Sequence, residues 1–415
     1  MKKRFLLIAQ PNSYRIAPYI KAAINLDLDV LIASEGKHSL ITEVHAGLHI
    51  NLHDLEESLA TILKASEKNP FTGVMGSDDS TVELAAMVAE KLRLPHNSPL
   101  SAKISRRKDL ARAHLASGMC PVPLHCLIDL SQPLGQQIAG LPFPCVIKPL
   151  NMSASRGVIR ANDKEEFITA CKRISAIIAD ATDEFEQTHV LVEDYIDGIE
   201  IAFEGYLHEG KLNPLTIFDK PDPLTGPFFE ETIYITPTSL EKPLQEKINH
   251  IVQKACIAYG LTTGPVHAEL RIDKNQNPWL LEVASRTIGG DCARILDTGK
   301  GLNLEALTIA LAMGETLPVE DTTELYRGVM MIPIKKQGLL KRTEGILAAR
   351  KVKHIDSIEI IIPTGHELIP LPEGNQYLGY IFATADTNEA VIDAIRRAYE
   401  LLDFVINPVF KLTNT

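Results

Sequence analysis

Residues 266–290 read VHAELRIDKNQNPWLLEVASRTIGG, and this stretch carries the strongest structural signal in the chain. The polar run 274–277 separates two runs rich in β-forming residues, which predicts the turn of a β-hairpin. Folding about the centre of this turn places Glu269 opposite Glu282 on one face. The other pairs expected on that face are His267 with Ala284 and Arg271 with Leu280.

The opposite face of the hairpin is predicted to be the core side, because side chains alternate along a strand and every residue on that face is apolar. The residues expected there are Val266, Ala268, Leu270, Ile272, Trp279, Leu281 and Val283.

On the polar face, like charges directly opposed across a ladder are destabilising unless something neutralises them. Mg²⁺ with bound phosphate does so, because it takes one or two carboxylates plus phosphate oxygens. Arg286, four residues after Glu282, adds a planar anion clamp beside them. The alternative interpretation is an exposed hairpin face that carries scattered charges, which is common in antiparallel sheets.

Composition narrows the class of protein. The chain has 415 residues, 45% of them apolar and 23% charged, as expected for a soluble globular protein of several subdomains. A net charge of −11 argues against a general nucleic-acid surface. The apolar run at residues 5–9 is too short for a signal peptide, and no run is long enough to span a membrane. Six scattered cysteines indicate reduced thiols, so we expect a cytoplasmic protein without nucleic-acid or membrane partners.

The first 100 residues alternate between strand and helix signals. Strands are predicted at residues 4–9, 29–34 and 73–76, and a helix is predicted to run to about residue 92. This alternation predicts a parallel α/β domain, and no dinucleotide motif is present. Asp78 and Asp79 are interpreted as caps of that helix, with a substrate role at the strand end as the alternative.

The rest of the chain reads as a mixture of strands and helices. Residues 142–148 and 157–160 predict strands, and a helix is expected over 162–179 with Asn162 and Glu165 at capping-box spacing. Its apolar stripe is Phe167, Ala170, Cys171, Ile174, Ile177 and Ile178. Further strands are expected at 189–196, 200–207 and 231–235, with a helix at 243–259. After Pro318, strands at 328–334, 357–362 and 380–385 and a helix at 388–402 indicate a separate small α+β unit.

Two segments have the chemistry of a nucleotide site. Lys148 ends a strand and precedes a short loop with Ser153, Ser155 and Gly157, which can wrap phosphate oxygens while Lys148 and Arg156 supply charge. The alternative is a solvated hairpin loop. The second segment, VLVEDYIDGIE, places Glu193 at a strand end and Glu200 seven residues later across a turn. Such strand-end glutamates either bind a nucleotide or are merely solvated.

Together these motifs resemble the ATP-grasp carboxylate–amine ligases over roughly residues 100–315. The resemblance implies that Lys108 and Lys148 reach ATP phosphates and that Glu200 holds the ribose. It also implies Mg²⁺ ligands at Glu269 and Glu282, with Mn²⁺ as the alternative ion. The adenine-binding hinge implied in this way consists of Glu193, Asp194, Tyr195 and Ile196.

One departure from the common ATP-grasp pattern points to a particular branch. Many members have Glu-x-Asn where this chain has Glu282, Val283 and Ala284, followed by Ser285 and Arg286. The pattern Glu-x-Ala-x-Arg resembles the L-amino acid ligase branch, which makes dipeptides, and so does the segment after residue 325. The resemblance implies that the arginine holds the substrate carboxylate and its acyl phosphate. The number of bound Mg²⁺ ions stays open without the Asn ligand.

The segment FDKPDPLTGPFFEET, residues 218–232, supplies the remaining substrate candidates. Lys220 is expected to reach the γ-phosphate. Glu230 or Glu231 is expected to hold an ammonium group, and strand alternation allows only one of them to face the site. His267 is interpreted as a structural hydrogen-bonding residue, with a catalytic base as the alternative.

We therefore expect an α/β and α+β protein with the ATP-grasp fold. The predicted parts are an N-terminal α/β domain (1–100), an ATP-grasp region (101–320) and a C-terminal α+β lobe (321–415). Within the middle region, a nucleotide lid is expected at about 125–195 and a catalytic part at about 196–320. The expected reaction joins a carboxylate to an amine, both small molecules such as amino acids. Another ATP-grasp reaction and a non-catalytic ATP-binding module are the alternatives. A homodimer is one of the oligomeric states left open.

Overall fold

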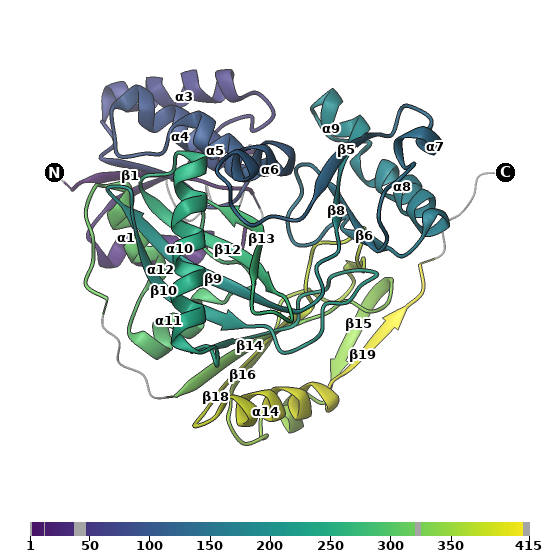
Figure 1. Cartoon of the computed structure of the whole chain (residues 1–415). Helices are drawn as coiled ribbons and strands as arrows, with labels where there is room; N and C mark the ends of the chain where they lie inside the picture. The colour runs from purple at the N-terminus through teal and green to yellow at the C-terminus, as the bar shows by residue number, and fades with distance from the viewer. Residues whose placement is uncertain (1, 12, 37–46, 320–324, 410–415) are drawn as a thin grey trace.

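A computed structural model describes residues 2–11, 13–36, 47–319 and 325–409 and contains four β-sheets (Figure 1). The N-terminal sheet is parallel with strand order β3-β2-β1-β4, as the alternating pattern predicts. Its strands are almost entirely apolar, as expected when helices cover a parallel sheet. They are β1 (Arg4–Ile8), β2 (Asp29–Ser34), β3 (Gly47–His49) and β4 (Gly73–Gly76). The helices among and after them are α1 (Ile16–Asn25), α3 (Leu55–Lys68), α4 (Val82–Leu92), α5 (Pro99–Arg106) and α6 (Lys108–Ser117).

A small antiparallel sheet of order β5-β8-β6-β7 follows. Helix α8 buries all six residues of its predicted apolar stripe, and all of them except Ile177 belong to the core shared with this sheet. Its N-cap is Asp163 and not Asn162, because Asp163 accepts hydrogen bonds from the backbone of Glu165 and Glu166. Glu166 in turn accepts from the backbone N–H of Asn162, the residue before the cap, so the reciprocal bonding resembles the predicted capping box but is shifted by one residue. The elements are β5 (His125–Asp129), α7 (Leu134–Gln137), β6 (Cys145–Pro149), β7 (Ile159–Ala161), α8 (Lys164–Ile178), α9 (Glu184–Thr188) and β8 (His189–Asp194).

The largest sheet has eight strands in the order β13-β12-β9-β10-β11-β14-β18-β16. Its strands are β9 (Ile199–His208), β10 (Lys211–Asp219), β11 (Ile233–Thr236), β12 (Gly264–Ile272), β13 (Pro278–Ala284), β14 (Tyr326–Ile332), β16 (Ile355–Ile360) and β18 (Gly379–Ala385). The helices associated with it are α10 (Lys242–Tyr259), α11 (Ala293–Lys300), α12 (Leu304–Ala312) and α14 (Asn388–Glu400).

The C-terminal strands are not separate from the rest of the fold, because β14, β18 and β16 extend this large sheet. A three-stranded sheet of β17 (Glu367–Leu368), β15 (Gly338–Glu344) and β19 (Asp403–Asn407) adjoins them, together with α13 (Ile346–Ala349). The predicted boundary at residue 321 lies outside the described residues, so the division into domains stays a prediction. Within the described part of the chain, no helix is both long and apolar enough to cross a membrane.

The hairpin of β12 and β13 forms with Glu269 opposite Glu282 and His267 opposite Ala284, as predicted. The ladder then shifts by one residue, so Arg271 lies opposite Trp279 and not Leu280. Because of this β-bulge, residues 278–280 of β13 face the opposite side of the sheet from the side predicted. The predicted faces are therefore wrong at three positions: Leu280 is fully buried in the core, whereas Leu281 and Trp279 are only partly buried.

Candidate active site

A cavity of about 1030 Å³ lies where the N-terminal sheet, the small sheet, the large sheet and the C-terminal segment meet. Most of the side chains expected to form a site line it. They are Lys108, Lys148, Ser153, Ser155, Arg156, Glu193, Asp194, Tyr195, Ile196, Glu200, Glu231, His267, Glu269, Glu282 and Arg286. Three predicted site residues, Gly157, Lys220 and Glu230, are not part of the lining.

Lys148 is positioned by a buried ion-pair group at the base of the small sheet. Its ammonium lies 2.6 Å from Glu193, which also accepts a hydrogen bond from Arg112 of α6. Burial raises the pKa of the Glu193 carboxyl, but Arg112 and Lys148 outweigh burial and lower this pKa to about 2. Arg112 also donates to the Leu281 carbonyl at 2.7 Å, at the bulge of β13. Arg112 thereby connects the small sheet to the hairpin that carries Glu282. No sequence motif predicted this connection.

Lys108 lies at the start of α6. It connects the loop expected to bind phosphate, which contains Ser153 and Ser155, to the hairpin of β12 and β13. Its ammonium donates to the Met152 carbonyl at 2.5 Å and lies 3.8 Å from Glu282. In the loop itself, Ala154 and Ser155 both have a φ of +54°, a left-handed conformation that costs energy in residues other than glycine. Such strain is typical of segments that bind ligands.

The C-terminal segment closes over this loop. Gly157 donates its backbone N–H to the Pro372 carbonyl at 2.9 Å, and Arg156 donates to the Glu373 carbonyl at 2.9 Å. Arg173 of α8 forms a further ion pair with the Glu373 carboxylate. In this arrangement Gly157 supports the loop from outside the cavity, whereas Ser153, Ser155 and Arg156 line it.

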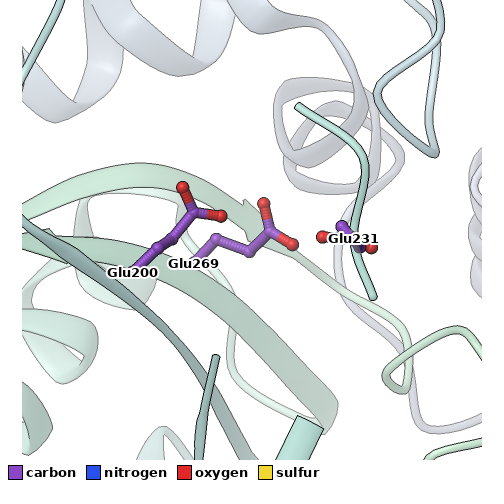
Figure 2. A group of neighbouring side chains, drawn as sticks. All are labelled: Glu200, Glu231 and Glu269. Atoms are coloured by element: carbon purple, nitrogen blue, oxygen red, sulfur yellow. The ribbon is translucent and has the colours of Figure 1, made fainter. Parts of the chain in front are cut away.

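Three carboxylates from two strands and a loop converge in the wall of the cavity (Figure 2). Glu200, Glu231 and Glu269 each offer an oxygen within 4.8 Å of the others. The Lys220 ammonium contacts all three, at 2.8, 2.9 and 3.2 Å respectively. Burial lowers the pKa of Lys220, but these carboxylates outweigh it and raise the pKa well above its usual value. Lys220 is only 7% exposed, so it lies beneath the cavity as their shared counter-ion.

Glu200 has a second cationic partner. Arg271, its cross-strand neighbour, donates to Glu200 at 2.9 Å and to the Ile196 carbonyl at 2.9 Å. Arg271 thus fixes both the carboxylate expected at the ribose and the end of the expected adenine hinge. Sequence reasoning treated Arg271 only as a paired position on the hairpin face.

Glu231, and not its neighbour Glu230, lines the cavity. It accepts a hydrogen bond from Tyr234 at 2.6 Å and one from Tyr377 of the C-terminal segment at 3.5 Å. Burial raises the pKa of Glu231 to about 7 despite the adjacent Lys220 ammonium. Glu230 lies on the other side of the chain, near Lys335.

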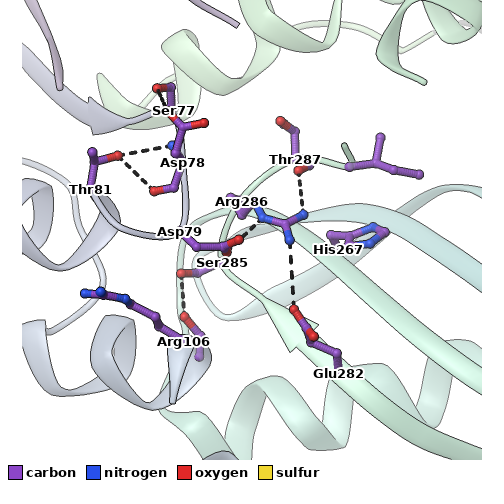
Figure 3. Close-up of polar contacts among 12 residues, drawn as sticks. Ser77, Asp78, Asp79, Thr81, Arg106, His267, Glu282, Ser285, Arg286 and Thr287 are labelled. Atoms are coloured by element: carbon purple, nitrogen blue, oxygen red, sulfur yellow. Dashed lines mark hydrogen bonds and ion pairs between the residues drawn. The ribbon is translucent and has the colours of Figure 1, made fainter. Parts of the chain in front are cut away.

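Arg286 lies between two acidic groups from distant parts of the chain (Figure 3). It donates to Asp79 at 2.8 Å and lies 3.9 Å from Glu282. The prediction that Asp79 caps α4 is wrong: Thr81 occupies the N-cap position, and Asp79 is the counter-ion of Arg286. Asp78 likewise accepts from Ser13 and Ser77. Burial raises the pKa of Asp79, but Arg286 outweighs burial and the net shift is downward.

Further lining residues, which no sequence motif marks, come largely from the N-terminal and C-terminal parts of the chain. Arg15 donates to the hydroxyl of Thr287 at 2.6 Å, beside Arg286. The aromatic residues in this end of the cavity are Tyr14, Tyr234, Tyr377 and Tyr380. No local motif marks them, because they reach the cavity only through the packing of distant segments.

Models of known families match three segments of the chain. The ATP-grasp N-terminal domain matches residues 20–96, the ATP-grasp domain matches residues 141–295, and the L-amino acid ligase C-terminal domain 2 matches residues 330–407. An uncharacterized protein of Sinorhizobium fredii is 22% identical over 98% of this chain and 84% of its own length. The alanine–anticapsin ligase of Bacillus subtilis is 26% identical over 64% of this chain, an alignment that spans 59% of that ligase.

Among solved structures, the L-amino acid ligase from Bacillus licheniformis superposes with a TM-score of 0.87 at 24% identity, covering 98% of this chain and 99% of that one. The chain therefore has the ATP-grasp fold and carries an ATP-grasp domain, which confirms the predicted fold class. The C-terminal match also confirms the predicted resemblance to the L-amino acid ligase branch.

Proposed function

We propose that this ATP-grasp protein is an ATP-dependent carboxylate–amine ligase that joins amino acids and releases ADP and phosphate. One observation carries the proposal: a single cavity holds two lysines, a strand-end hinge, opposed carboxylates and an arginine. These are the groups needed to hold a nucleotide, its phosphates and a carboxylate together. The amino-acid class is supported by the similarity to alanine–anticapsin ligase and to an L-amino acid ligase.

In this proposal the small sheet and its loop hold ATP. Lys108 and Lys148 bind the phosphates, with Ser153, Ser155 and Arg156 of the loop around them. The backbone of residues 194–196 reads the adenine edge, and Glu200 accepts hydrogen bonds from the ribose. Lys148 is already held by Glu193, so its ammonium is directed into the cavity without a large loss of side-chain entropy on binding.

Glu269 and Glu282 would hold Mg²⁺, with Mn²⁺ as the alternative ion. The donor set fits a hard cation, because two carboxylates face each other across the ladder, the cations nearest Glu282 are 3.8 and 3.9 Å away, and Lys220 contacts only Glu269 of the pair, at 3.2 Å. When it is bound, the ion would neutralise part of the negative charge of the phosphates. The cluster of Glu200, Glu231 and Glu269 is a less suitable metal site, since Lys220 already occupies its centre.

The chemistry has two steps. A carboxylate oxygen of the first substrate, held by Arg286, attacks the γ-phosphorus, so the bond to the β-phosphate oxygen breaks and ADP leaves. The amine of the second substrate then attacks the carbonyl carbon of the acyl phosphate, the carbon–oxygen bond to phosphate breaks, and the amine loses a proton. Glu231 holds this amine while it is an ammonium group, in a position set by Tyr234 and Tyr377. Positioning and charge stabilisation supply most of the rate enhancement.

Two further expectations remain parts of the proposal. Small molecules are the only partners invoked, and a homodimer remains one of the possible assemblies. The six cysteines are all unpaired, which is consistent with the reducing cytoplasm.

A screen for ADP release over pairs of amino acids tests the function, with mass spectrometry of the products. The expected products are a dipeptide or another amide, ADP and phosphate. AMP and pyrophosphate would instead indicate adenylation, and ADP release that requires bicarbonate would favour a carboxylase-type reaction. A protein that binds ATP and releases no ADP with any pair would be a non-catalytic module.

A further inference from the structure

Glu204 of β9 is a buried carboxylate that the proposed reaction does not use. Its side chain is fully buried, and it lies behind the cavity wall and not in the lining. Placing a carboxylate in such a position is costly unless its oxygens accept strong hydrogen bonds. Burial raises the pKa of Glu204, while the partners described below oppose that shift. A costly group of this kind requires a structural or functional reason.

Both partners of Glu204 lead directly to the active site. Glu204 lies opposite His267 across the β9–β12 ladder, and its Oε2 is 3.2 Å from His267 Nδ1. The backbone N–H of Ile288 donates to the same carboxylate, at 3.2 Å from Oε1 and 3.1 Å from Oε2. Glu204 therefore connects the strand that carries Glu269 to the loop that follows Arg286.

The hydrogen bond at Nδ1 fixes the orientation of the His267 ring. With Nδ1 directed at Glu204, Nε2 points the other way, towards Glu269 Oε1 at 3.8 Å, and His267 lines the cavity. Figure 3 shows the His267 ring beside Arg286. Ala202, between Glu204 and Glu200 on the same strand face, is the cross-strand neighbour of Glu269.

The hydrogen bond from the backbone N–H of Ile288 to Glu204 fixes the loop that follows Arg286. Arg286, Thr287 and Ile288 are consecutive, and Arg286 and Ile288 both line the cavity. Arg286 is held from one side by Asp79 of the N-terminal domain. Glu204 holds the same loop from the large sheet, two residues away, so the loop is held from both sides.

We propose that Glu204 is a positioning residue, which directs His267 Nε2 into the cavity and fixes the loop that carries Arg286. The inference rests on the proposed ligase function. Because the hydrogen-bond partners of Glu204 lie on the large sheet and in the loop after Arg286, the effect should fall on turnover and on the carboxylate substrate and not on ATP affinity. Residues that orient site groups from behind typically affect activity by about 10- to 100-fold.

Four variants test this proposal. Glu204→Gln is nearly isosteric and weakens both links. His267→Asn keeps a nitrogen near the position of Nδ1 and lacks Nε2, whereas His267→Gln keeps a nitrogen near Nε2 and lacks Nδ1. Glu209→Gln, at the exposed turn after β9, is the control for loss of one negative charge.

The assay uses the amino-acid pair that gives the fastest ADP release with the wild-type protein. We expect Glu204→Gln and both His267 variants to lose about tenfold or more in kcat. Affinity for a non-hydrolysable ATP analogue should stay within about twofold in calorimetry, and Glu209→Gln should match the wild type. The double variant Glu204→Gln/His267→Asn should be no slower than the slower single variant, because both changes break one unit.

A spectroscopic readout separates this proposal from the proposed function. In the protein without substrate, NMR should show a strongly hydrogen-bonded His267 Nδ1 proton, whose signal moves upfield in Glu204→Gln because a neutral amide is a weaker acceptor than a carboxylate. If the wild type releases no ADP with any pair while this signal behaves as expected, the proposed ligase function is wrong, whereas the hydrogen bond between Glu204 and His267 is confirmed. Wild-type kcat in Glu204→Gln, additive losses in the double variant, or a parallel loss of ATP affinity would overturn the positioning role. Should Glu204→Gln not fold, unchanged kcat in His267→Asn would overturn it equally.

Discussion

Glu269 and Glu282 lie directly opposite each other on β12 and β13, and the ladder bulges at Leu281, immediately beside the pair. The bulge places Leu281 on the cavity side and leaves its carbonyl free to accept from Arg112. The two carboxylates therefore lie on a distorted, anchored part of the hairpin. Bulges commonly redirect side chains next to active sites.

Glu282→Gln should abolish ADP release, a loss of at least about two orders of magnitude, because it removes one charge from the pair that would hold Mg²⁺. Its ion pairs with Lys108 and Arg286 are long and partly exposed, so the midpoint of thermal unfolding should change little. Circular dichroism checks the fold, and exposed Glu246→Gln on α10 is the control. Turnover at the wild-type rate would contradict the metal assignment.

Lys148→Met should weaken ATP binding by about one to two decades, since it removes a charged donor but keeps the apolar stem. Calorimetry with an ATP analogue measures the change. The variant should also lose stability, because Glu193 keeps only Arg112 as a cationic partner. Unchanged nucleotide affinity would show that Lys148 serves Glu193 alone.

Arg286→Lys should lose ligase activity while ATP affinity is nearly retained. A guanidinium can hold Asp79 and a substrate carboxylate at the same time through its planar set of donors, and an ammonium cannot reproduce this geometry. Kinetics at varied amino-acid concentration, together with calorimetry for ATP, separates the two effects. Loss of ATP affinity with an unchanged KM for the amino acid would assign Arg286 to the nucleotide.

Glu231→Gln should raise the KM of the amine substrate by about tenfold or more, as expected for loss of a charge-assisted hydrogen bond. The adjacent Glu230→Gln is a matched control, because Glu230 lies outside the cavity lining. Steady-state ADP release at saturating ATP measures both. Equal effects of the two variants would rule out a specific ammonium site at Glu231.

The free energy of unfolding should fall between about pH 5 and pH 2 through Glu193. The pKa of this carboxyl is about 2 in the folded protein, below its ordinary value of 4.5, so its contribution is complete above pH 4.5 and is lost as the pH falls towards 2. The difference corresponds to about 3 kcal/mol. Denaturant unfolding at several pH values should show a shallower acid dependence in Glu193→Gln, and an identical slope would contradict the prediction.

The sequence by itself predicted the elements whose pattern is local. The alternation in residues 266–290 specified a hairpin with its carboxylates opposed, and the helical spacing of six apolar residues specified the buried face of α8. Local spacing is sufficient here because the strand and helix periods decide which side chains share a face. The resemblance carried by Lys148, Glu193, Glu269 and Glu282 also rested on order and spacing along the chain.

Only the tertiary structure decided which charges are paired and which residue faces the cavity. Asp79 and Arg286 are 207 positions apart, and Arg112 and Leu281 are 169 apart, so no local period connects them. The helix-cap interpretation of Asp79 came from judging a charge by its sequence neighbours alone, and the γ-phosphate role expected for Lys220 stays a prediction. A buried charge needs a counter-ion wherever the fold can supply one, and that partner is set by the packing of distant segments.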